Sequence, residues 1–250
     1  MSAHYDNFDY PSYWESRIYE HKSEVFVLEN FFKRLKIIGT IADIGAGYGR
    51  LIPTYIHRAK RIYLTDPSSK LLSIAKEKYK NKKIKFIHSK IENLETKIKP
   101  SSVDLVLFIR VLHHVKNLDN AFRIINRLLK NNGHLILEFP NKLHFKSALN
   151  ELRHGNLTFL LDIFPKDIRS KKSINTGCID FFNYHPDDVL NHLENNGFRI
   201  IDIKSVSNIR SVILKKLLPV EILLYLEKYL QRMFSKTRFG PSLFILASKK

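Results

Sequence analysis

The segment Ile41-Ala-Asp-Ile-Gly-Ala-Gly-Tyr-Gly-Arg50 decides how this chain is expected to fold. A short apolar run leads directly into three alternate glycines, which is typical of a strand that ends in a tight turn before a helix. Glycine adopts positive φ and has no Cβ, so a ligand can approach the backbone of such a turn closely. The N–H groups that open the next helix favour an electronegative group. The segment therefore predicts a ligand-binding turn.

The spacing of these glycines differs from that of the nicotinamide-dependent oxidoreductases. Gly45, Gly47 and Gly49 follow the pattern G-x-G-x-G, whereas the dinucleotide fingerprint is G-x-G-x-x-G, with its third glycine one place later. Asp43 stands two residues before the first glycine. The spacing argues against a dinucleotide as the ligand.

A second acidic residue, Asp66, ends the next apolar run about 20 residues further along, where an acid can accept hydrogen bonds from ribose hydroxyls. Asp66 can also be interpreted as the N-cap of a helix that begins in Pro67-Ser-Ser69. The glycines, the acid and their spacing together favour the ribose interpretation. We therefore expect Asp43 and Asp66 to border one cavity.

Apolar runs and segments with helical spacing alternate along the chain. The runs that we interpret as strands are residues 41–44, 61–65, 84–87, 103–109, 134–139, 198–206 and 243–247. Asn131-Asn-Gly133 is expected to supply a left-handed residue that ends a helix before the fifth strand. Such alternation requires right-handed crossovers and predicts an α/β fold with an open, mostly parallel sheet covered by helices on both faces.

We expect residues 1–250 to form one domain with two elaborations. Residues 1–38 are predicted to be an N-terminal helical cap, and residues 140–183 interrupt the alternation after the fifth strand. An insertion there lies beside the carboxyl ends of the strands, where ligands bind in open α/β sheets. Residues 140–183 are therefore predicted to form a substrate-side lid that contains short helices.

The chain is strongly basic, with a formal net charge of +18 and a pI of about 9.8. Such a charge attracts polyanions nonspecifically, but the lysines are spread over the whole chain and form no basic arm, so we assign no specific nucleic acid. Residues 209–230 are compatible with a helix that lies on anionic lipid. Their expected role is the last crossover helix, with its lysines in solvent.

The sequence favours a cytoplasmic protein. Cys178 is the only cysteine, which excludes an internal disulfide and suits a reducing compartment. No signal peptide is visible at the N-terminus, and no apolar run reaches the ~18–20 residues that a membrane span requires. We expect a soluble protein without a transmembrane segment, for which peripheral membrane contact stays open.

Several segments beyond the glycine turn are similar to those of one family. They are Leu64–Leu72, Ser101–Val115, Leu128–Leu137 and the tail from His185 to Ile245. With these segments the chain resembles the class I S-adenosylmethionine-dependent methyltransferases, in the small-molecule branch that includes ubiquinone-pathway enzymes, over about residues 10–248. The resemblance implies a Rossmann-like, seven-stranded sheet with a lid inserted after the fifth strand, and S-adenosylmethionine as the cofactor.

The resemblance also implies roles for the residues of the two motifs. Gly45, Gly47 and Gly49 would pass close to the methionine part of the cofactor, Asp43 would hold the turn or the amino group, and Asp66 would bind the ribose.

The adenine side departs from the family pattern. Residues Lys90–Asn93 would flank the adenine, and many members place an aspartate where this chain has Lys90. Because lysine cannot accept a hydrogen bond, the adenine amino group would be bound by Glu92 or by the backbone of Ile91.

Two arginines are further candidates for the cofactor site. Arg110 stands where the fourth strand ends, a usual place for functional groups, although a surface ion pair explains it equally well. Arg17, in the segment Tyr13-Trp14-Glu-Ser-Arg17, resembles a residue that covers the cofactor carboxylate in related enzymes. For Trp14 we expect core packing.

Methyl transfer requires that a nucleophile be aligned and water excluded, and a general base helps when the acceptor is a hydroxyl or an amine. His113 and His185 are the candidate catalytic residues, ahead of His114, His144 and His154. No ligand pattern for a metal is present.

The expected function is methylation of a hydroxyl, amine or carbon of a small-molecule or lipid-like acceptor. Two alternatives stay open: an RNA methyltransferase, and a basic protein that binds nucleic acid or a membrane surface without catalysis. Against the first, no Asn-Pro-Pro-Tyr-type motif for a flipped base follows the fourth strand.

Overall fold

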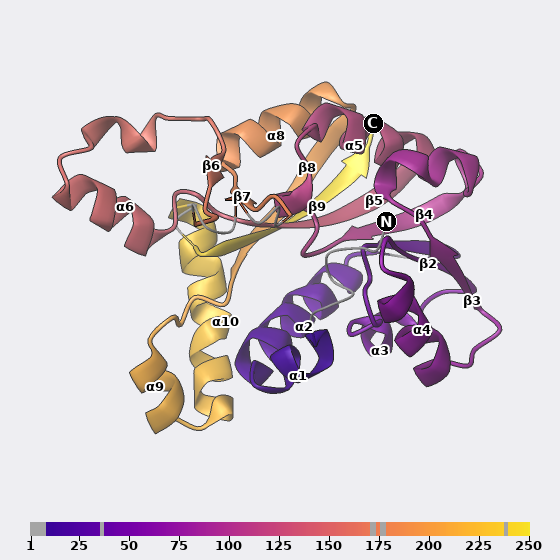
Figure 1. Ribbon diagram of the computed structural model, residues 1–250, viewed down its shortest axis with the longest axis horizontal. Coiled ribbons are helices and arrows are strands. Elements are labelled where there is room, and N and C mark those ends of the chain that lie inside the picture. Colours follow the sequence, from indigo (N-terminus) through magenta and orange to yellow (C-terminus); the bar gives the residue numbers. More distant parts are fainter. Residues whose placement is uncertain (1–8, 36–37, 171–173, 176–178, 238–239) are drawn as a thin grey trace.

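The computed structural model describes residues 9–35, 38–170, 174–175, 179–237 and 240–250. Seven strands form one sheet in the order β3-β2-β1-β4-β5-β9-β8 (Figure 1). Their bounds are β1 Thr40–Ile44, β2 Arg61–Asp66, β3 Ile84–His88, β4 Val103–Phe108, β5 Leu129–Pro140, β8 Phe198–Val206 and β9 Ser242–Lys249. Only β9 runs antiparallel to its neighbours in this sheet, β5 and β8. The predicted open, mostly parallel sheet is confirmed.

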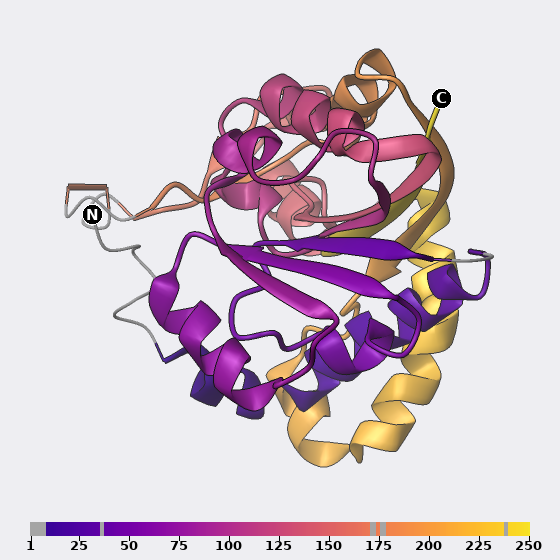
Figure 2. The same ribbon diagram turned by 90° about the vertical axis from the view of Figure 1, so that its right-hand side faces the viewer.

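Helices cover both faces of the sheet (Figure 2). On one face lie α1 Tyr10–Glu15, α2 Ile18–Phe32, α3 Ile52–Tyr55, α4 Ser69–Lys78 and α10 Val220–Thr237. On the other face lie η2 Ile91–Thr96, α5 Leu118–Leu128 and α8 Pro186–Asn195. Each face therefore has a hydrophobic core of its own.

The central strands show why the sheet is buried on both sides. In β4, Leu105 and Leu107 pack into the core beneath α2, whereas Val106 and Phe108 pack into the core beneath α5. All four are fully buried. Successive side chains of a strand point to opposite faces, so a continuous apolar run is what a doubly covered parallel strand requires.

Local details differ from the sequence prediction near the fifth strand. Helix α5 ends at Leu128 because Leu129 is already extended, and β5 begins there. The left-handed residue is Asn132, with a φ of 59°, and it lies within β5 instead of ending the helix. The prediction that a left-handed residue ends this helix was therefore wrong, although the strand that follows was placed correctly.

The insertion after β5 contains two short helices and a small ladder. These elements are α6 Phe145–Arg153, the 3₁₀ helix η4 Leu157–Leu160, and the strands β6 Lys166–Asp167 and β7 Phe182–Asn183, which pair antiparallel. The short helices were predicted, and the ladder was not. Residues 171–173 and 176–178, including Cys178, lie outside the described residues, as do residues 1–8 and 36–37 of the predicted cap.

The predicted long amphipathic segment is divided into two helices, α9 Val212–Leu217 and α10, with Leu218 and Pro219 between them. Leu218 is extended, as is usual for a residue before proline. Among the helices described here, none is long and apolar enough to pass through a bilayer.

Candidate cofactor site

A cavity of about 220 Å³ lies at the carboxyl ends of β1, β2 and β4. The glycine turn after β1 forms its floor, and the aromatic side chains of Tyr10, Tyr13 and Trp14 cover it from the N-terminal helices. Phe181, just before β7, closes a further side from the insertion. The parallel strands bring these segments to one edge, as the alternating pattern of the sequence predicts.

The glycine turn is held open towards this cavity. Gly45 and Gly47 have φ values of 73° and 57°, a backbone conformation that other residues rarely adopt. A Cβ at Gly45 would come within 2.3 Å of Val111, and a Cβ at Gly47 would meet only Leu71, at 3.7 Å. A side chain at Gly47 would therefore occupy space that a ligand can use.

The third glycine has a different role. Gly49, with a φ of 78°, is not part of the cavity wall. A Cβ there would approach Ile52 to 2.5 Å and Tyr79 to 3.1 Å. Gly49 therefore allows α3 to pack closely behind the turn, and it does not approach the cavity.

Asp43 and Asp66 border the same cavity, as expected, because β1 and β2 are parallel neighbours. The Asp66 carboxylate accepts hydrogen bonds from the Gly47 N–H and the Ser68 N–H, both at 2.8 Å. Ser68 is the N-cap of α4, since its hydroxyl accepts from the Leu71 N–H. The capping interpretation of Asp66 was therefore wrong.

Asp43 is buried beneath the turn and accepts a hydrogen bond of 2.6 Å from the Tyr55 hydroxyl. Burial raises the pKa of Asp43 to about 7, although the hydrogen bond from Tyr55 opposes this shift, and the nearby Asp66 adds to it. Near neutral pH the Asp43 carboxyl can therefore gain or lose a proton in response to a charged ligand.

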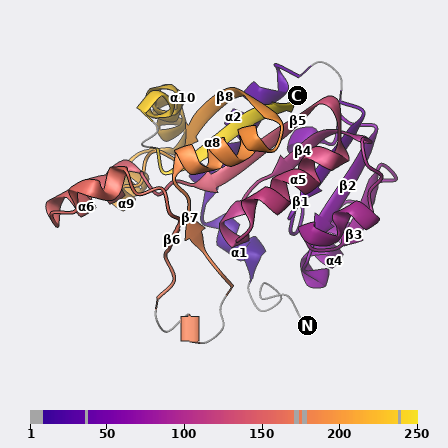
Figure 3. The ribbon, with the colours of Figure 1, turned by 90° about the horizontal axis from the view of Figure 1, so that it is seen from above.

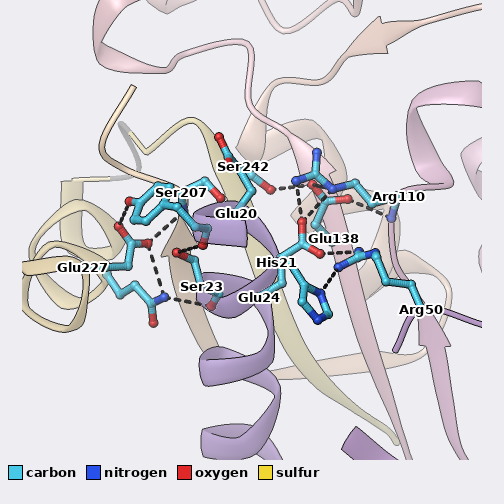
Figure 4. A network of polar contacts seen from close by, with 12 residues as sticks. Glu20, His21, Ser23, Glu24, Arg50, Arg110, Glu138, Ser207, Glu227 and Ser242 are labelled. Carbon is cyan, nitrogen blue, oxygen red and sulfur yellow. Dashed lines mark hydrogen bonds and ion pairs between the residues drawn. The ribbon is translucent and has the colours of Figure 1, made fainter. Parts of the chain in front are cut away.

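A buried carboxylate, that of Glu24 in α2, lies between two arginines of the cavity wall (Figure 4). It accepts from Arg50 Nη2 at 2.5 Å and from Arg110 Nε at 2.8 Å. Burial alone would raise the pKa of Glu24, but the positive charges of Arg110 and Arg50 outweigh it and lower the pKa. Glu24 is therefore a buried anion that fixes both guanidinium groups.

Arg110 is also held through its backbone. Its φ of 63° is left-handed, which is uncommon for a residue other than glycine. Its N–H donates to the buried carboxylate of Glu138 at 2.9 Å, and Glu138 also pairs with Ser242 of β9. The surface ion pair considered for Arg110 was therefore not found, because its partners are buried and the side chain borders the cavity.

Trp14 does not pack in the core as expected. It is half-buried in the cavity wall, and the Arg50 guanidinium lies over its ring at 3.6 Å from the centroid. Neither Arg50 nor Glu24 was predicted as a site residue. The signals were present, since Arg50 directly follows the glycines and Glu24 is a charged residue on the apolar face of a helix with Val27, Leu28 and Phe31.

Besides Gly49, three predicted cofactor residues lie outside this cavity wall. The Arg17 guanidinium lies over the Tyr13 ring at 4.3 Å. Ile91 packs into the core because the chain turns into η2 after Lys90, and Glu92 is exposed. The structure therefore brings the glycine turn, Asp43, Asp66 and Arg110 together, and leaves Arg17 and the adenine-side residues apart from them.

Of the two candidate catalytic histidines, only His113 borders the cavity. Its ring stacks on Phe181, with centroids 4.3 Å apart, and its buried Nδ1 has no hydrogen-bond partner in the described part of the chain. Burial lowers the pKa of His113 to about 3, and the positive charge of Arg110 adds to this shift. His185 instead caps α8, where its Nδ1 accepts from the Asp187 N–H at 3.1 Å.

The other histidines considered are also engaged elsewhere. His114 borders the cavity, and its Nδ1 lies 2.6 Å from the carbonyl of Asp180. His144 is the N-cap of α6, and His154 stands at the C-terminal end of the same helix. Within the described ranges, no group of three or more His, Cys, Asp or Glu side chains is placed to hold a metal ion.

Known proteins share both the sequence pattern and the fold. Residues 42–137 match the family model described as a methyltransferase domain. The chain is 30% identical, over 75% of its length and 67% of the relative's, to a protein of Saccharomyces cerevisiae described as a probable S-adenosylmethionine-dependent methyltransferase. It is 28% identical to the ubiquinone/menaquinone biosynthesis C-methyltransferase of Campylobacter jejuni, over 67% of this chain and 73% of the relative.

The fold comparison agrees. An N-methyltransferase from Bradyrhizobium japonicum, solved with S-adenosyl-L-homocysteine, superposes with a TM-score of 0.61 at 12% identity, over 97% of this chain and 93% of that one. The family resemblance of the sequence is confirmed by these comparisons and by the strand order. The chain therefore belongs to the class I S-adenosylmethionine-dependent methyltransferases, and S-adenosylmethionine is its cofactor.

Proposed function

We propose that this enzyme methylates a small-molecule or lipid-like acceptor that enters beside His113 and Phe181. The observation that carries this proposal is one cavity that joins the glycine turn and Asp66 to a separate aromatic side formed by Phe181 of the insertion. The cofactor supplies an electrophilic sulfonium methyl group. The protein has to bind both molecules, align them and exclude water.

The cofactor fits the polar side of the cavity. We assign the ribose hydroxyls to Asp66 and the methionine part to the backbone of Gly45 and Gly47, where a Cβ at Gly47 would take the ligand's place. The methionine carboxylate would approach Arg50 and Arg110, and its ammonium group would approach Asp43. This assignment pairs each charge of the zwitterion with a side chain of opposite charge.

The acceptor is assigned to the side of His113. At neutral pH the low pKa of His113 keeps its imidazole uncharged. Its Nδ1 can therefore form one hydrogen bond with a hydroxyl or amine of the methyl acceptor, but the ring does not become protonated. Burying an unpaired polar atom is unfavourable unless a ligand satisfies it. We therefore assign His113 to positioning the acceptor, and Phe181 to covering it with the predicted substrate-side insertion.

The relatives support an acceptor of this class. The Campylobacter jejuni relative is named for C-methylation in ubiquinone and menaquinone biosynthesis. An RNA acceptor is less favoured, because Phe108-Ile-Arg110 stands where a base-binding motif would follow β4. We also place the enzyme in the cytoplasm, since a chain with a single cysteine, Cys178, suits a reducing compartment.

The acceptor class can be tested with cofactor labelled at the methyl group. The purified enzyme is incubated with cell extract that has been separated into RNA, protein, lipid and small-molecule fractions. We expect label in the small-molecule or lipid fraction, because the aromatic side of the cavity suits such a molecule. Label that appears in the RNA fraction and is lost after ribonuclease treatment would overturn the proposal.

The role of His113 can be tested in the same assay. His113→Phe keeps a ring that stacks on Phe181 and removes Nδ1, so we expect kcat to fall about 10- to 100-fold, as for a lost hydrogen bond in a buried site. Affinity for S-adenosylhomocysteine, measured by calorimetry, should not change. His154→Phe, at the exposed end of α6, is the control. An unchanged kcat in His113→Phe would contradict the assignment.

Asp66→Ala should weaken S-adenosylhomocysteine binding by at least about tenfold, because hydrogen bonds to a charged acceptor are worth about 1.5–3 kcal/mol. Asp104→Ala is the matched control. Its carboxylate accepts from the N–H groups of Gly39 and Thr40 at the opposite edge of the sheet, so it also anchors backbone. Equal weakening in both variants would mean that Asp66 acts only on the fold.

Binding should also depend on pH through Asp43. Its raised pKa of about 7 means that the carboxyl of the free enzyme is protonated below that pH, and pairing with the ligand ammonium requires the ionised form. Affinity for S-adenosylhomocysteine should therefore fall by about tenfold per pH unit as the pH drops below 7. Calorimetry between pH 5.5 and about 8.5 measures this dependence.

Two variants isolate the Asp43 carboxyl. Asp43→Asn should remove the pH dependence. Tyr55→Phe should move its midpoint to higher pH, because the hydrogen bond from Tyr55 lowers the Asp43 pKa. A pH dependence that persists in Asp43→Asn would assign the titration to another group.

A further inference from the structure

Helices α9 and α10 expose large apolar side chains on their outward side, which we name the outer face. It includes Ile213 and Leu217 of α9, and Ile222, Leu226, Tyr229 and Met233 of α10. Leu217 is 73% exposed and Tyr229 is 61% exposed. The four residues of α10 follow the spacing i, i+4, i+7, i+11, so they form one continuous stripe along the helix. Large apolar patches of this kind mark interaction sites in soluble proteins.

The inward side of α10 carries two polar residues in addition to the buried Leu223. Glu227 and Gln231, one turn apart, are buried against the protein. The Tyr19 hydroxyl donates to Glu227 at 2.5 Å, the Ser207 N–H donates to it at 2.8 Å, and Gln231 donates to the Ser23 carbonyl at 3.2 Å. Figure 4 shows Glu227 pointing towards the segments that carry Ser23 and Ser207.

Helix α10 therefore differs from an ordinary surface helix, which buries its whole apolar stripe and exposes its polar residues. It buries Leu223 together with Glu227 and Gln231, and its other large apolar residues stay exposed. The buried hydrogen bonds of Glu227 fix the rotation of α10, so the helix cannot turn its stripe inward without leaving these polar groups unpaired. Lys216 and Lys228 face solvent, as the sequence predicts, whereas Lys215 pairs with Glu20, and large apolar residues lie beside them. The fold therefore keeps these large apolar side chains exposed to solvent.

Positive charge surrounds the outer face. Lys216, Lys228 and Arg232 are exposed, and Glu221 is the one acidic residue that α9 and α10 expose over residues 212–235. A surface that combines apolar and basic side chains matches the chemistry of an anionic bilayer, whose acyl region takes the apolar groups and whose headgroups attract lysine and arginine. Tyrosines such as Tyr229 are favoured at the boundary between the two.

The α9 part of the outer face lies at the carboxyl ends of the strands, as the cavity does. Helix α9 follows the carboxyl end of β8, which runs in the same direction as β5. The insertion that follows β5 lies at the same end of the molecule in Figures 1 and 3, and its helix α6 also exposes apolar residues, Phe145 and Leu152. Burial lowers the pKa of Arg210, just before α9, and the positive charge of Arg110 in the cavity wall lowers it further. The start of α9 is therefore close enough to the cavity for the two arginines to interact.

We propose that the outer face docks on the surface of an anionic phospholipid bilayer and brings the cavity edge close to the membrane. The charge alone would also suit RNA, but RNA binding does not explain an exposed apolar stripe. A second copy of this chain carries the same positive charge on the same face, which opposes self-association. The observations therefore favour the bilayer.

The test is flotation of the full chain with vesicles at about 0.15 M salt, without cofactor or acceptor. We expect at least about tenfold stronger partitioning onto phosphatidylcholine vesicles with about 30% phosphatidylglycerol than onto phosphatidylcholine alone. Leu217→Gln/Leu226→Gln should reduce partitioning onto the mixed vesicles at least about tenfold, because two exposed side chains lose their apolar contact. Since the assay needs no methyl transfer, its failure leaves the proposed acceptor class untouched.

A matched pair of charge variants tests whether the bilayer binds at the outer face. Lys216→Glu/Lys228→Glu should weaken partitioning at least about tenfold, since each basic residue near an anionic surface contributes about fivefold. Lys82→Glu/Lys83→Glu changes two exposed lysines before β3, at the other end of the sheet, by the same charge and should have little effect. Unchanged S-adenosylhomocysteine affinity shows that each variant is folded.

Three outcomes would overturn the proposal. The first is that the chain does not partition onto the mixed vesicles, and the second is that both charge variants weaken this partitioning equally. The third is that the chain binds an RNA oligonucleotide but not the vesicles. A dimer in lipid-free buffer that Leu217→Gln/Leu226→Gln dissociates, with no vesicle binding, would assign the outer face to a second copy of the chain.

Discussion

One buried carboxylate, that of Glu24, connects the N-terminal helices to the strand ends that border the cavity. It is fully buried and pairs with Arg50, after the glycine turn, and with Arg110, after β4. A charge in this position is tolerated only because it is paired and hydrogen-bonded, and removal of one partner of such a pair costs about 3–5 kcal/mol. Because Glu24 belongs to α2, these ion pairs also hold the adjoining α1, with its aromatic residues, over the cavity.

The charges around the cavity divide it into two parts. On one side the guanidinium groups of Arg50 and Arg110 are fixed by Glu24, so they do not need to reorganise when an anion arrives. On the other side Asp43 and Asp66 present carboxylates, of which Asp43 changes its protonation near neutral pH. An amino acid zwitterion linked to a nucleoside is a ligand that satisfies both sides. On the side of Phe181, the described lining residues are Ile179, His113 and His114, none of which is an Asp, Glu, Lys or Arg, so this side is suited to a less polar acceptor.

The sequence alone predicted the elements that depend on local patterns. All seven strands and the joining of Asp43 and Asp66 at one cavity follow from apolar runs and from the geometry of parallel strands. The missed features depend on contacts between distant segments. The pairing of Glu24 with Arg110 spans 86 residues, and no periodicity of α2 reveals it. The burial of Glu227 on the inward side of α10 was missed for the same reason, because its partner Tyr19 lies 208 residues away in the chain.

Strand β9, which follows both β5 and β8 in the chain, lies between them in the sheet. During synthesis, β5 and β8 therefore have no common partner until β9 leaves the ribosome, and an unpaired strand edge invites wrong pairing with other chains. The same late segment supplies Ser242, which pairs with Glu138 behind Arg110, while α10 fixes α2 through contacts 208 residues apart. A nascent chain that stops short of β9 consequently has its glycine turn but lacks the supports of its arginine pair. Cofactor capture by the supported arginine pair therefore follows the synthesis of β9, although the glycine turn is made much earlier.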